Sequence, residues 1–294
     1  MHHHPVSERN LALAVVFNVV ITVVQLVGGV ISGSLALLSD ALHNFSDVMS
    51  LIVSWFANRI ATRKADEKST FGYRRAEILA ALFNASALVG IGVYIVYEAV
   101  GRMMHPESID SVWVIWLGLL GVLVNGGSIW LLHHDARGNV NIKAAYLHLS
   151  GDLLTSVAVV VGGLLIHFWQ IFWIDPLISI GIAIYLIYAS AGLIAETVGV
   201  LMQFAPEKID IGKIAEKVEE IPDVRNIHHI HLWRLGEHDI FLEAHIDFDR
   251  NLSLEEVTRK TAQIEELLKE RFGITHVTLQ PEYRRNDSKS LIGG

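Results

Sequence analysis

Two pairs of residues, each inside an apolar segment, have types and spacings suited to binding a metal ion. His43 and Asp47 lie four residues apart, and His148 and Asp152 repeat this spacing much later in the chain. On a helix, residues four apart share one face, so each pair would present an imidazole beside a carboxylate. If the two helices face each other, two nitrogen and two oxygen ligands surround one position. That tetrahedral set suits zinc and related metals.

The composition indicates a membrane protein. The 294-residue chain is 52% hydrophobic and only 18% charged, and its mean hydropathy of +0.41 is too high for an ordinary soluble protein. More than half of the Asp, Glu, Lys and Arg residues lie after Ala205, which predicts a membrane domain followed by a soluble one. The chain has no cysteine, so any metal must be held by His and carboxylates. Its net charge of −8 argues against nucleic acid as a partner.

Six membrane-spanning helices are expected, because about 20 apolar residues are enough to cross a bilayer. They lie within residues 10–39, 41–57, 78–97, 112–132, 145–168 and 175–196. The loop after the second segment is rich in Lys and Arg. By the positive-inside rule, this loop and both termini are therefore predicted to be cytoplasmic.

After Ala205 the pattern becomes that of a small soluble domain. Helices are expected at 209–221 and 253–271, and strands at 227–235, 240–248 and 276–280. Ser253 and Glu256 form a predicted capping box at the start of the second helix. The order αββαβ predicts an α+β domain with its helices on one face of the sheet. The predicted domains are an N-terminal tail (1–9), a membrane domain (10–204), a cytoplasmic domain (205–285) and a flexible C-terminal tail (286–294).

Ionisable residues inside membrane segments are costly, which favours a functional reason for them. An unpaired Asp at the bilayer centre costs roughly 2.5–3.5 kcal/mol on insertion scales, so two His-Asp pairs favour a cation site over a purely structural polar cluster. Asp40, one turn before His43, is either a partner of that site or its entry path, or only the cap of its helix. Because imidazole titrates near neutral pH, protons would compete with the metal, which leads to the hypothesis that zinc exit is coupled to proton entry.

Together with the two His-x-x-x-Asp pairs, three further patterns resemble the cation diffusion facilitator family, whose members export zinc and related ions by proton antiport. These are SGSLALLSD at 32–40, FGYRRAE at 71–77 and HHIHLW at 228–233. The resemblance covers nearly the whole chain. It implies a six-span bundle, a metallochaperone-like cytoplasmic domain and a homodimer, with zinc as transported and regulatory ion. In family terms His43, Asp47, His148 and Asp152 form the transport site, in the version that looks like the zinc-selective branch.

Six histidines lie between positions 228 and 276 in the soluble part. His228, His245 and His276 each fall on a different predicted strand, and Glu282 follows the last of them. They are either ordinary polar residues of a half-exposed sheet or metal ligands. Compared with the family, these four positions resemble its cytoplasmic metal site, with His229 and Gln280 as further candidate ligands.

The sequence departs from the family in two loops. Some members bind a second metal after the second span through histidines, but here those positions are Ser69 and Tyr73, which leaves Asp66 and Glu67. The long His-rich loop of many eukaryotic relatives is reduced to His133–His134, which favours a bacterial protein of the inner membrane. The N-terminal His2–His4 run is equally a tag remnant or a native metal-collecting tail.

Two other classes of function compete with transport. An intramembrane metalloenzyme would also use a metal in a bundle, but the chain has no His-Glu-x-x-His motif and no Gly-x-Ser-x-Gly motif. A membrane-anchored metal sensor would need its spans only as an anchor, and six spans with metal-binding residues near the middle of the membrane exceed that need. Transport of cadmium, cobalt, iron or manganese in place of zinc is compatible with the same ligands.

Overall fold

The computed structural model describes residues 8–132, 140–236 and 239–293. The chain divides into two compact units. The first comprises Met1–Trp55 with Ala81–Ile194, and the second comprises Phe56–Ala80 with Ala195–Gly294.

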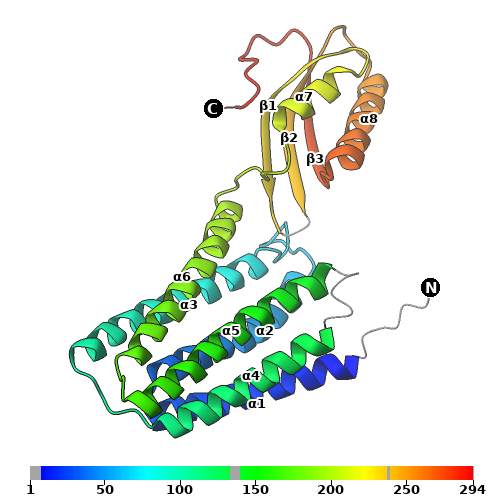
Figure 1. The fold of residues 1–294 in the computed structure, drawn as a ribbon. Coiled ribbons are helices and arrows are strands. Elements are labelled where there is room, and N and C mark those ends of the chain that lie inside the picture. The colour runs from blue at the N-terminus through cyan, green and yellow to red at the C-terminus, as the bar shows by residue number, and fades with distance from the viewer. Residues whose placement is uncertain (1–7, 133–139, 237–238, 294) are drawn as a thin grey trace. The chain divides into compact units, whose positions relative to one another are not determined.

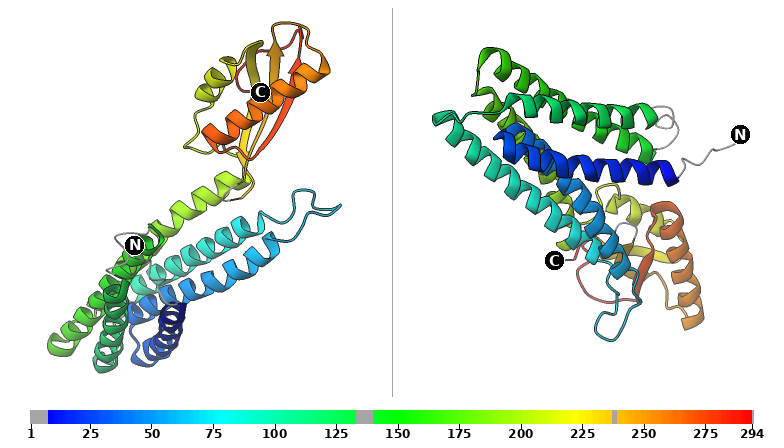
Figure 2. Two further views of the ribbon diagram at one scale, coloured as in Figure 1. Left: turned by 90° about the vertical axis from the view of Figure 1, so that its right-hand side faces the viewer. Right: turned by 90° about the horizontal axis from the view of Figure 1, so that it is seen from below.

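Long helices dominate the first part of the chain (Figures 1 and 2). They are α1 (Glu8–Ser32), α2 (Leu35–Ala61), α3 (Ala76–Met104), α4 (Ser111–Leu132), α5 (Val140–Trp169) and α6 (Ile174–Leu201). Within the first unit, α4 packs against both α1 and α5.

A transmembrane domain is evident from the length and apolar character of these helices. Among the described residues, four helical segments can cross a membrane: Ala76–Met104, Ser111–Trp130, Tyr146–Trp169 and Ile174–Leu201. A shorter apolar stretch, Val19–Ser32, lies in α1. The first half of α2 carries Asp40, His43 and Asp47, and such residues need a protein interior rather than lipid. The count of six spans stays a prediction.

Helix α2 contributes to both apolar clusters of the first unit. Ala36 and Leu37 pack with residues of α4, α5 and α6, among them Leu117 and Leu186. On another face of the helix, Leu35 packs with residues of α3 and α6. Because neighbours surround its N-terminal half, the polar side chains of this half are held among protein groups.

A carboxylate from another helix caps the start of α2. Asp175, in the first turn of α6, accepts hydrogen bonds from the Ser34 hydroxyl (2.5 Å) and the Leu35 amide (2.7 Å). The Ala36 amide lies 3.3 Å from the same carboxylate. These amides have no partner within their own helix, so Asp175 satisfies donors that burial would otherwise leave unpaired. Arg102 of α3 donates to the Gly33 carbonyl of the same turn, at 2.5 Å.

The second unit contains a small α+β domain. Its elements are α7 (Ile211–Glu219), β1 (Val224–Arg234), β2 (Ile240–Phe248), α8 (Leu254–Phe272) and β3 (His276–Glu282). The sheet order is β1-β2-β3, with β1 antiparallel and β3 parallel to β2. Both helices contribute to one core with the sheet, including Ile214 of α7 and Leu268 of α8.

The structure confirms the predicted order αββαβ. The Ser253 hydroxyl accepts from the Glu256 amide, and the Glu256 carboxylate accepts from the Ser253 amide, so the predicted capping box is present. These bonds to Ser253 hold the pKa of Glu256 down, at about 2.

The C-terminal segment makes backbone contacts with β1, and the flexible tail that the sequence predicts for 286–294 stays a prediction. The amides of His229 and Ile230 in β1 donate to the carbonyls of Ser290 and Leu291. Ile292 then forms a β-bridge with Ile230. The described part of the segment is thus bonded to the edge of the sheet (Figure 1).

Replacing Asp175 by Ala should destabilise the helical domain. The change leaves the Leu35 and Ala36 amides without their carboxylate, and losing a cap costs about 0.5–2 kcal/mol. We expect a lower unfolding temperature in detergent. Asp110→Ala is the matched control, because Asp110 is an exposed cap that accepts from the Val112 amide of α4. If Asp175→Ala lowers the unfolding temperature no more than Asp110→Ala does, the role of the buried cap is contradicted.

Candidate metal centres

Helices α2 and α5 bring the four residues of the two His-x-x-x-Asp pairs together. The Nε2 atom of His43 lies 3.1 Å from Asp152 Oδ1 and 3.7 Å from Asp47 Oδ2. The Nε2 atom of His148 lies 3.2 Å from Asp47 Oδ2 and 3.7 Å from Asp152 Oδ2. One ligand atom from each residue lies within 4.8 Å of every other, so the four can surround one ion. We call this group the membrane site.

These separations fit a tetrahedral zinc ion. With bonds of about 2.0 Å, neighbouring ligand atoms of a tetrahedron lie about 3.3 Å apart. The four nitrogen-to-oxygen distances of 3.1, 3.2, 3.7 and 3.7 Å bracket that value, and the two that involve Asp152 end on different oxygens of its carboxylate. Closing four ligands around one ion therefore requires side-chain movement that brings a single Asp152 oxygen toward both imidazoles. An octahedral ion with six oxygen ligands has no such match here.

The membrane site is open at one end. His43 and Asp152 are buried, whereas 48% of the His148 side chain and 31% of the Asp47 side chain are exposed. Asp47 follows His43 along α2, and His148 precedes Asp152 along α5. The exposed pair thus lies toward the C-terminal end of α2 and the N-terminal end of α5. An ion reaching the site from that end would meet Asp47 and His148 first.

A second group of potential ligands lies at one end of the small sheet. It consists of His228 of β1, His245 of β2, Glu282 of β3 and Asp287 of the C-terminal segment. His245 Nδ1 lies 3.0 Å from Glu282 Oε1, and His228 Nε2 lies 3.5 Å from Glu282 Oε2. Asp287 Oδ2 lies 3.8 Å from His228 Nε2 and 4.0 Å from His245 Nδ1. We call this group the sheet site.

Comparison with known proteins identifies the family. Residues 11–202 match the cation efflux transmembrane domain, and residues 206–284 match the cytoplasmic domain of cation efflux proteins. The chain belongs to the cation efflux, or cation diffusion facilitator, family.

Bacterial members of the family are similar over most of their length. The cadmium, cobalt and zinc/H(+)-K(+) antiporter of Bacillus subtilis is 34% identical, over 99% of this chain and 94% of the relative. The metal cation efflux system protein CzcD of Cupriavidus metallidurans is 35% identical, over 96% of this chain and 89% of the relative. The zinc transporter ZitB of Escherichia coli is 36% identical, over 89% of this chain and 83% of the relative.

In this cation efflux protein, Asp40 is a neighbour of the membrane site and does not cap its helix. α2 begins at Leu35, so Asp40 lies inside it, and of the alternatives left open by the sequence the helix cap is wrong. Its carboxylate accepts hydrogen bonds from Thr155 (2.6 Å) and Ser156 (3.2 Å) of α5. Thr155 also contacts the backbone carbonyl of Asp152, at 2.9 Å. Asp40 therefore ties α2 to the turn of α5 that carries a ligand, as the outer shell of a metal site does.

Thr155 and Ser156 were not predicted as site residues from the sequence, although their spacing from Asp152 is a signal for such a role. They follow Asp152 by three and four residues, which places them on the same helix face as that ligand. A hydroxyl pair one turn beyond a buried carboxylate is a pattern that predicts support of the ligand.

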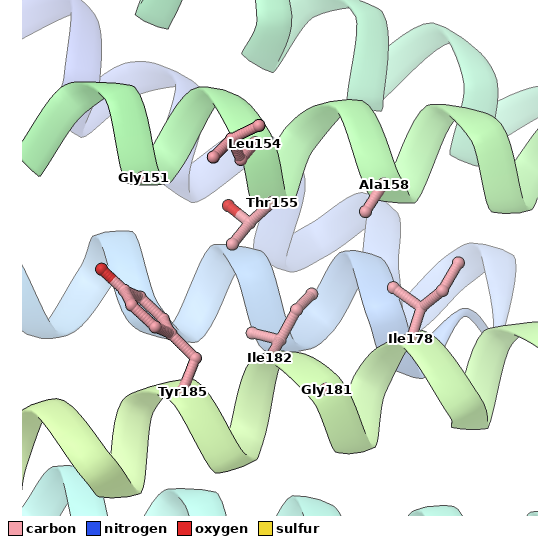
Figure 3. Close-up of a pocket in the computed structure, with 8 residues that line it drawn as sticks. All are labelled: Gly151, Leu154, Thr155, Ala158, Ile178, Gly181, Ile182 and Tyr185. Carbon is pink, nitrogen blue, oxygen red and sulfur yellow. The ribbon is translucent and has the colours of Figure 1, made fainter.

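A groove of about 350 Å³ runs between α5 and α6 beside the membrane site. Its lining is mostly apolar, with Leu154, Ile178 and Ile182 contributing (Figure 3). Tyr185 of α6 reaches across it toward α5, and its ring meets the His43 ring edge-on with centroids 6.4 Å apart. Gly151 lies beside the Tyr185 hydroxyl, and a Cβ atom at that position would come within 3.0 Å of it. The groove leaves space between these two helices next to the ligands.

His276 does not join the sheet site. It begins β3, paired with Phe241, whereas Glu282 ends the same strand, paired with Asp247. Six residues of extended strand separate the two by about 20 Å. The His276 ring stacks on Phe241 with centroids 4.3 Å apart, which gives it a packing role. Of the four residues expected there, the structure groups His228, His245 and Glu282, and Asp287 is the fourth member.

Asp287 was missed because it lies in a polar segment without periodicity, beyond the last predicted strand. The two further candidates lie close to the site. His229 stacks on His245 with centroids 4.7 Å apart, and the Gln280 amide donates to Glu282 at 2.8 Å. A β-bulge between His228 and His231 turns His229, whose φ is +53°, out of the regular alternation.

A chain of hydrogen bonds orients the imidazole of His228. The Asn226 amide nitrogen donates to Asp247 at 3.3 Å, which leaves the Asn226 oxygen to face His228 Nδ1 at 2.9 Å. Nδ1 therefore carries the proton, and the lone pair of Nε2 points toward Glu282. This is the tautomer that a metal-ligating histidine needs. Burial lowers the pKa of His245, which favours its neutral form as well.

The loop after α2 offers no comparable group of ligands in its described residues. Asp66 accepts from the Ser69 and Lys68 amides and from the Tyr73 hydroxyl, and these bonds lower the pKa of its carboxyl. It thus stabilises a turn. His133–His134 and His2–His4 lie outside the described residues.

Replacing Asp152 by Asn should weaken zinc binding at the membrane site by at least the ten- to hundredfold that losing an outer-shell partner costs. Asp152 contacts both imidazoles, and the amide removes a negative charge from the ligand set. Binding is measured by titration calorimetry of full-length protein carrying His245→Ala, so that the sheet site does not contribute. Asp66→Asn is the control for loss of a carboxylate elsewhere. If the two variants bind zinc equally well, the assignment of the membrane site is wrong.

Proposed function

We propose that this chain exports zinc across a membrane in exchange for protons, with the membrane site carrying the ion. The observation that carries the proposal is the convergence of His43, Asp47, His148 and Asp152, one ligand atom from each within 4.8 Å of the others, on two helices of a transmembrane domain. Membership of a transporter family supports it. The relatives named above as zinc transporter or metal antiporter support zinc as the cargo, with cadmium and cobalt as further candidates.

Charge balance in the membrane site explains why protons are the counter-ion. Two carboxylates and one divalent cation are neutral together, and so are two carboxylates and two imidazolium groups. In the structure each His Nε2 lies against the carboxylates, where a proton on the nitrogen would donate to them. Metal binding requires those protons to leave. Exchange of one zinc ion for two protons would therefore keep the site neutral in a medium where net charge is costly.

The exposed side of the membrane site supports alternating access as part of the proposal. The exposed pair of the membrane site lies toward the N-terminal end of α5 and toward the C-terminal end of α2, which leads into the basic loop that the positive-inside rule predicts to be cytoplasmic. The arrangement thus corresponds to an inward-facing state that loads zinc from the cytoplasm. At the other end, Asp175 and Arg102 bind the turn between α1 and α2. The groove between α5 and α6 provides space for these helices to shift during the change of state.

The complete arrangement proposed is a homodimer of six-span protomers in a bacterial inner membrane, with both termini cytoplasmic. The family resemblance and the bacterial relatives support this proposal. The sheet site is proposed to bind zinc as a regulatory ion through His228, His245, Glu282 and Asp287. Zinc bound there would bias the equilibrium between conformations by stabilising the one that binds it.

Proton-coupled zinc flux in vesicles is the decisive test of transport. Protein reconstituted with a pH-sensitive dye should show saturable zinc movement accompanied by proton movement in the opposite direction. Asp47→Ala should abolish both, because it removes the ligand that contacts both imidazoles at the open end of the site. Glu67→Ala, a change in the exposed loop after α2, should leave both intact.

Zinc movement without a linked pH change would contradict antiport. Binding without any flux in the native protein would favour a sensor or an enzyme over a transporter. A series of zinc, cadmium, cobalt, iron and manganese in the same vesicles ranks the ions.

A further inference from the structure

The C-terminal segment brings a cation to the sheet site. Lys289 Nζ lies 2.9 Å from Asp247 Oδ2 and 3.2 Å from Glu282 Oε2, and it also pairs with Asp287. It lies 3.3 Å from His228 Nε2, whose lone pair it faces. The ammonium is thus held by two carboxylates and one imidazole of the sheet site, with Asp247 as a third carboxylate.

Lys289 and a metal ion compete for some of the same donor groups: Lys289 Nζ faces His228 Nε2 and Glu282 Oε2, and it pairs with Asp287 through Oδ1. A zinc ion bound to Glu282, Asp287 and His228 would lie about 2 Å from each ligand atom. The ammonium already lies within hydrogen-bonding distance of all three residues. Two cations that share these ligands would repel each other and would overlap in space. Occupancy by one therefore excludes the other.

The backbone beside Lys289 is held as well. The carbonyls of Ser290 and Leu291 accept from the His229 and Ile230 amides at 3.0 and 2.9 Å. Gly293 packs against the His229 ring so closely that a Cβ atom there would come within 2.3 Å of it. The segment that carries the ammonium is therefore continuous with residues that hydrogen-bond to the edge of β1 and form one β-bridge with it.

We propose that Lys289 is a tethered competitor of the regulatory metal, which occupies the sheet site when zinc is scarce. Metal binding expels the ammonium and loosens residues 290–292 from β1. This inference rests on the proposed regulatory site and adds a mechanism to it. Asp287 lies in the same segment but remains bound to the metal as a ligand. Only the residues that follow Asp287 are therefore released. The sheet site then reports zinc concentration through the position of the C-terminal segment.

Removing the ammonium should tighten zinc binding. In a protein whose metal-free site is mostly blocked, the apparent dissociation constant is raised by the reciprocal of the open fraction. Lys289→Met should therefore bind zinc at least tenfold more tightly than the parent. Lys289→Arg, which keeps the positive charge, should show no such gain. Lys269→Met, which removes an exposed lysine of α8 remote from the sheet site, should bind like the parent.

The measurement is a competition titration of zinc with a fluorescent chelator. It uses full-length protein in detergent that carries Asp47→Ala, so that the membrane site does not contribute. His245→Ala in this background should abolish the binding that remains. If it does, and Lys289→Met binds like the parent, the competitor role is overturned while the regulatory site stands. If the Asp47→Ala protein binds no zinc, the regulatory site itself fails, and the competitor role fails with it.

Hydrogen exchange gives a second readout that does not depend on affinity. The amides of His229 and Ile230 should exchange slowly without metal and faster when zinc is added, because their acceptors lie in the released segment. The same amides should not respond to zinc in the His245→Ala protein. Unchanged or slower exchange on zinc binding would contradict release of the segment.

Discussion

The cost of placing charge in a bilayer is the constraint on which the rest of the structure depends. Two carboxylates inside a membrane domain are tolerated only if opposite charge meets them. In the mechanism proposed for this chain the opposite charge is exchangeable: either two protons on His43 and His148 or one divalent ion would neutralise Asp47 and Asp152. The need to neutralise the two carboxylates, which makes the site costly in a membrane, would therefore also couple the movement of zinc to that of protons. A structural salt bridge with Lys or Arg would satisfy the electrostatics and would leave nothing to transport.

The packing around α2 serves this constraint. Its N-terminal half lies among apolar residues of α3 to α6, so its polar side chains face helices and not lipid. Asp175 holds its first amides, and Asp40 binds the hydroxyls of Thr155 and Ser156. These contacts fix α2 at its start and beside α5, which keeps His43 opposite Asp152. The open end of the site has fewer such contacts, as access for an ion requires.

Much of the membrane site could be predicted because helical periodicity is strict. Residues four apart share a face, so two His-x-x-x-Asp pairs in apolar segments predict four converging ligands without knowledge of the fold. The sheet site was less predictable, because strand position along the chain does not say which end of a sheet a residue reaches. His276 and Glu282 share β3 but lie at its opposite ends. Asp287 and Lys289 reach the site through backbone pairing with β1, which leaves no periodic signal in the sequence.

The central claim, a tetrahedral ion on two imidazoles and two carboxylates, is tested most directly by X-ray absorption at the zinc edge. The sample is zinc-loaded protein carrying His245→Ala, so that only the membrane site binds metal. The account predicts four ligands near 2.0 Å, with the outer-shell scattering of two imidazole rings. Six oxygen ligands without imidazole scattering would contradict it.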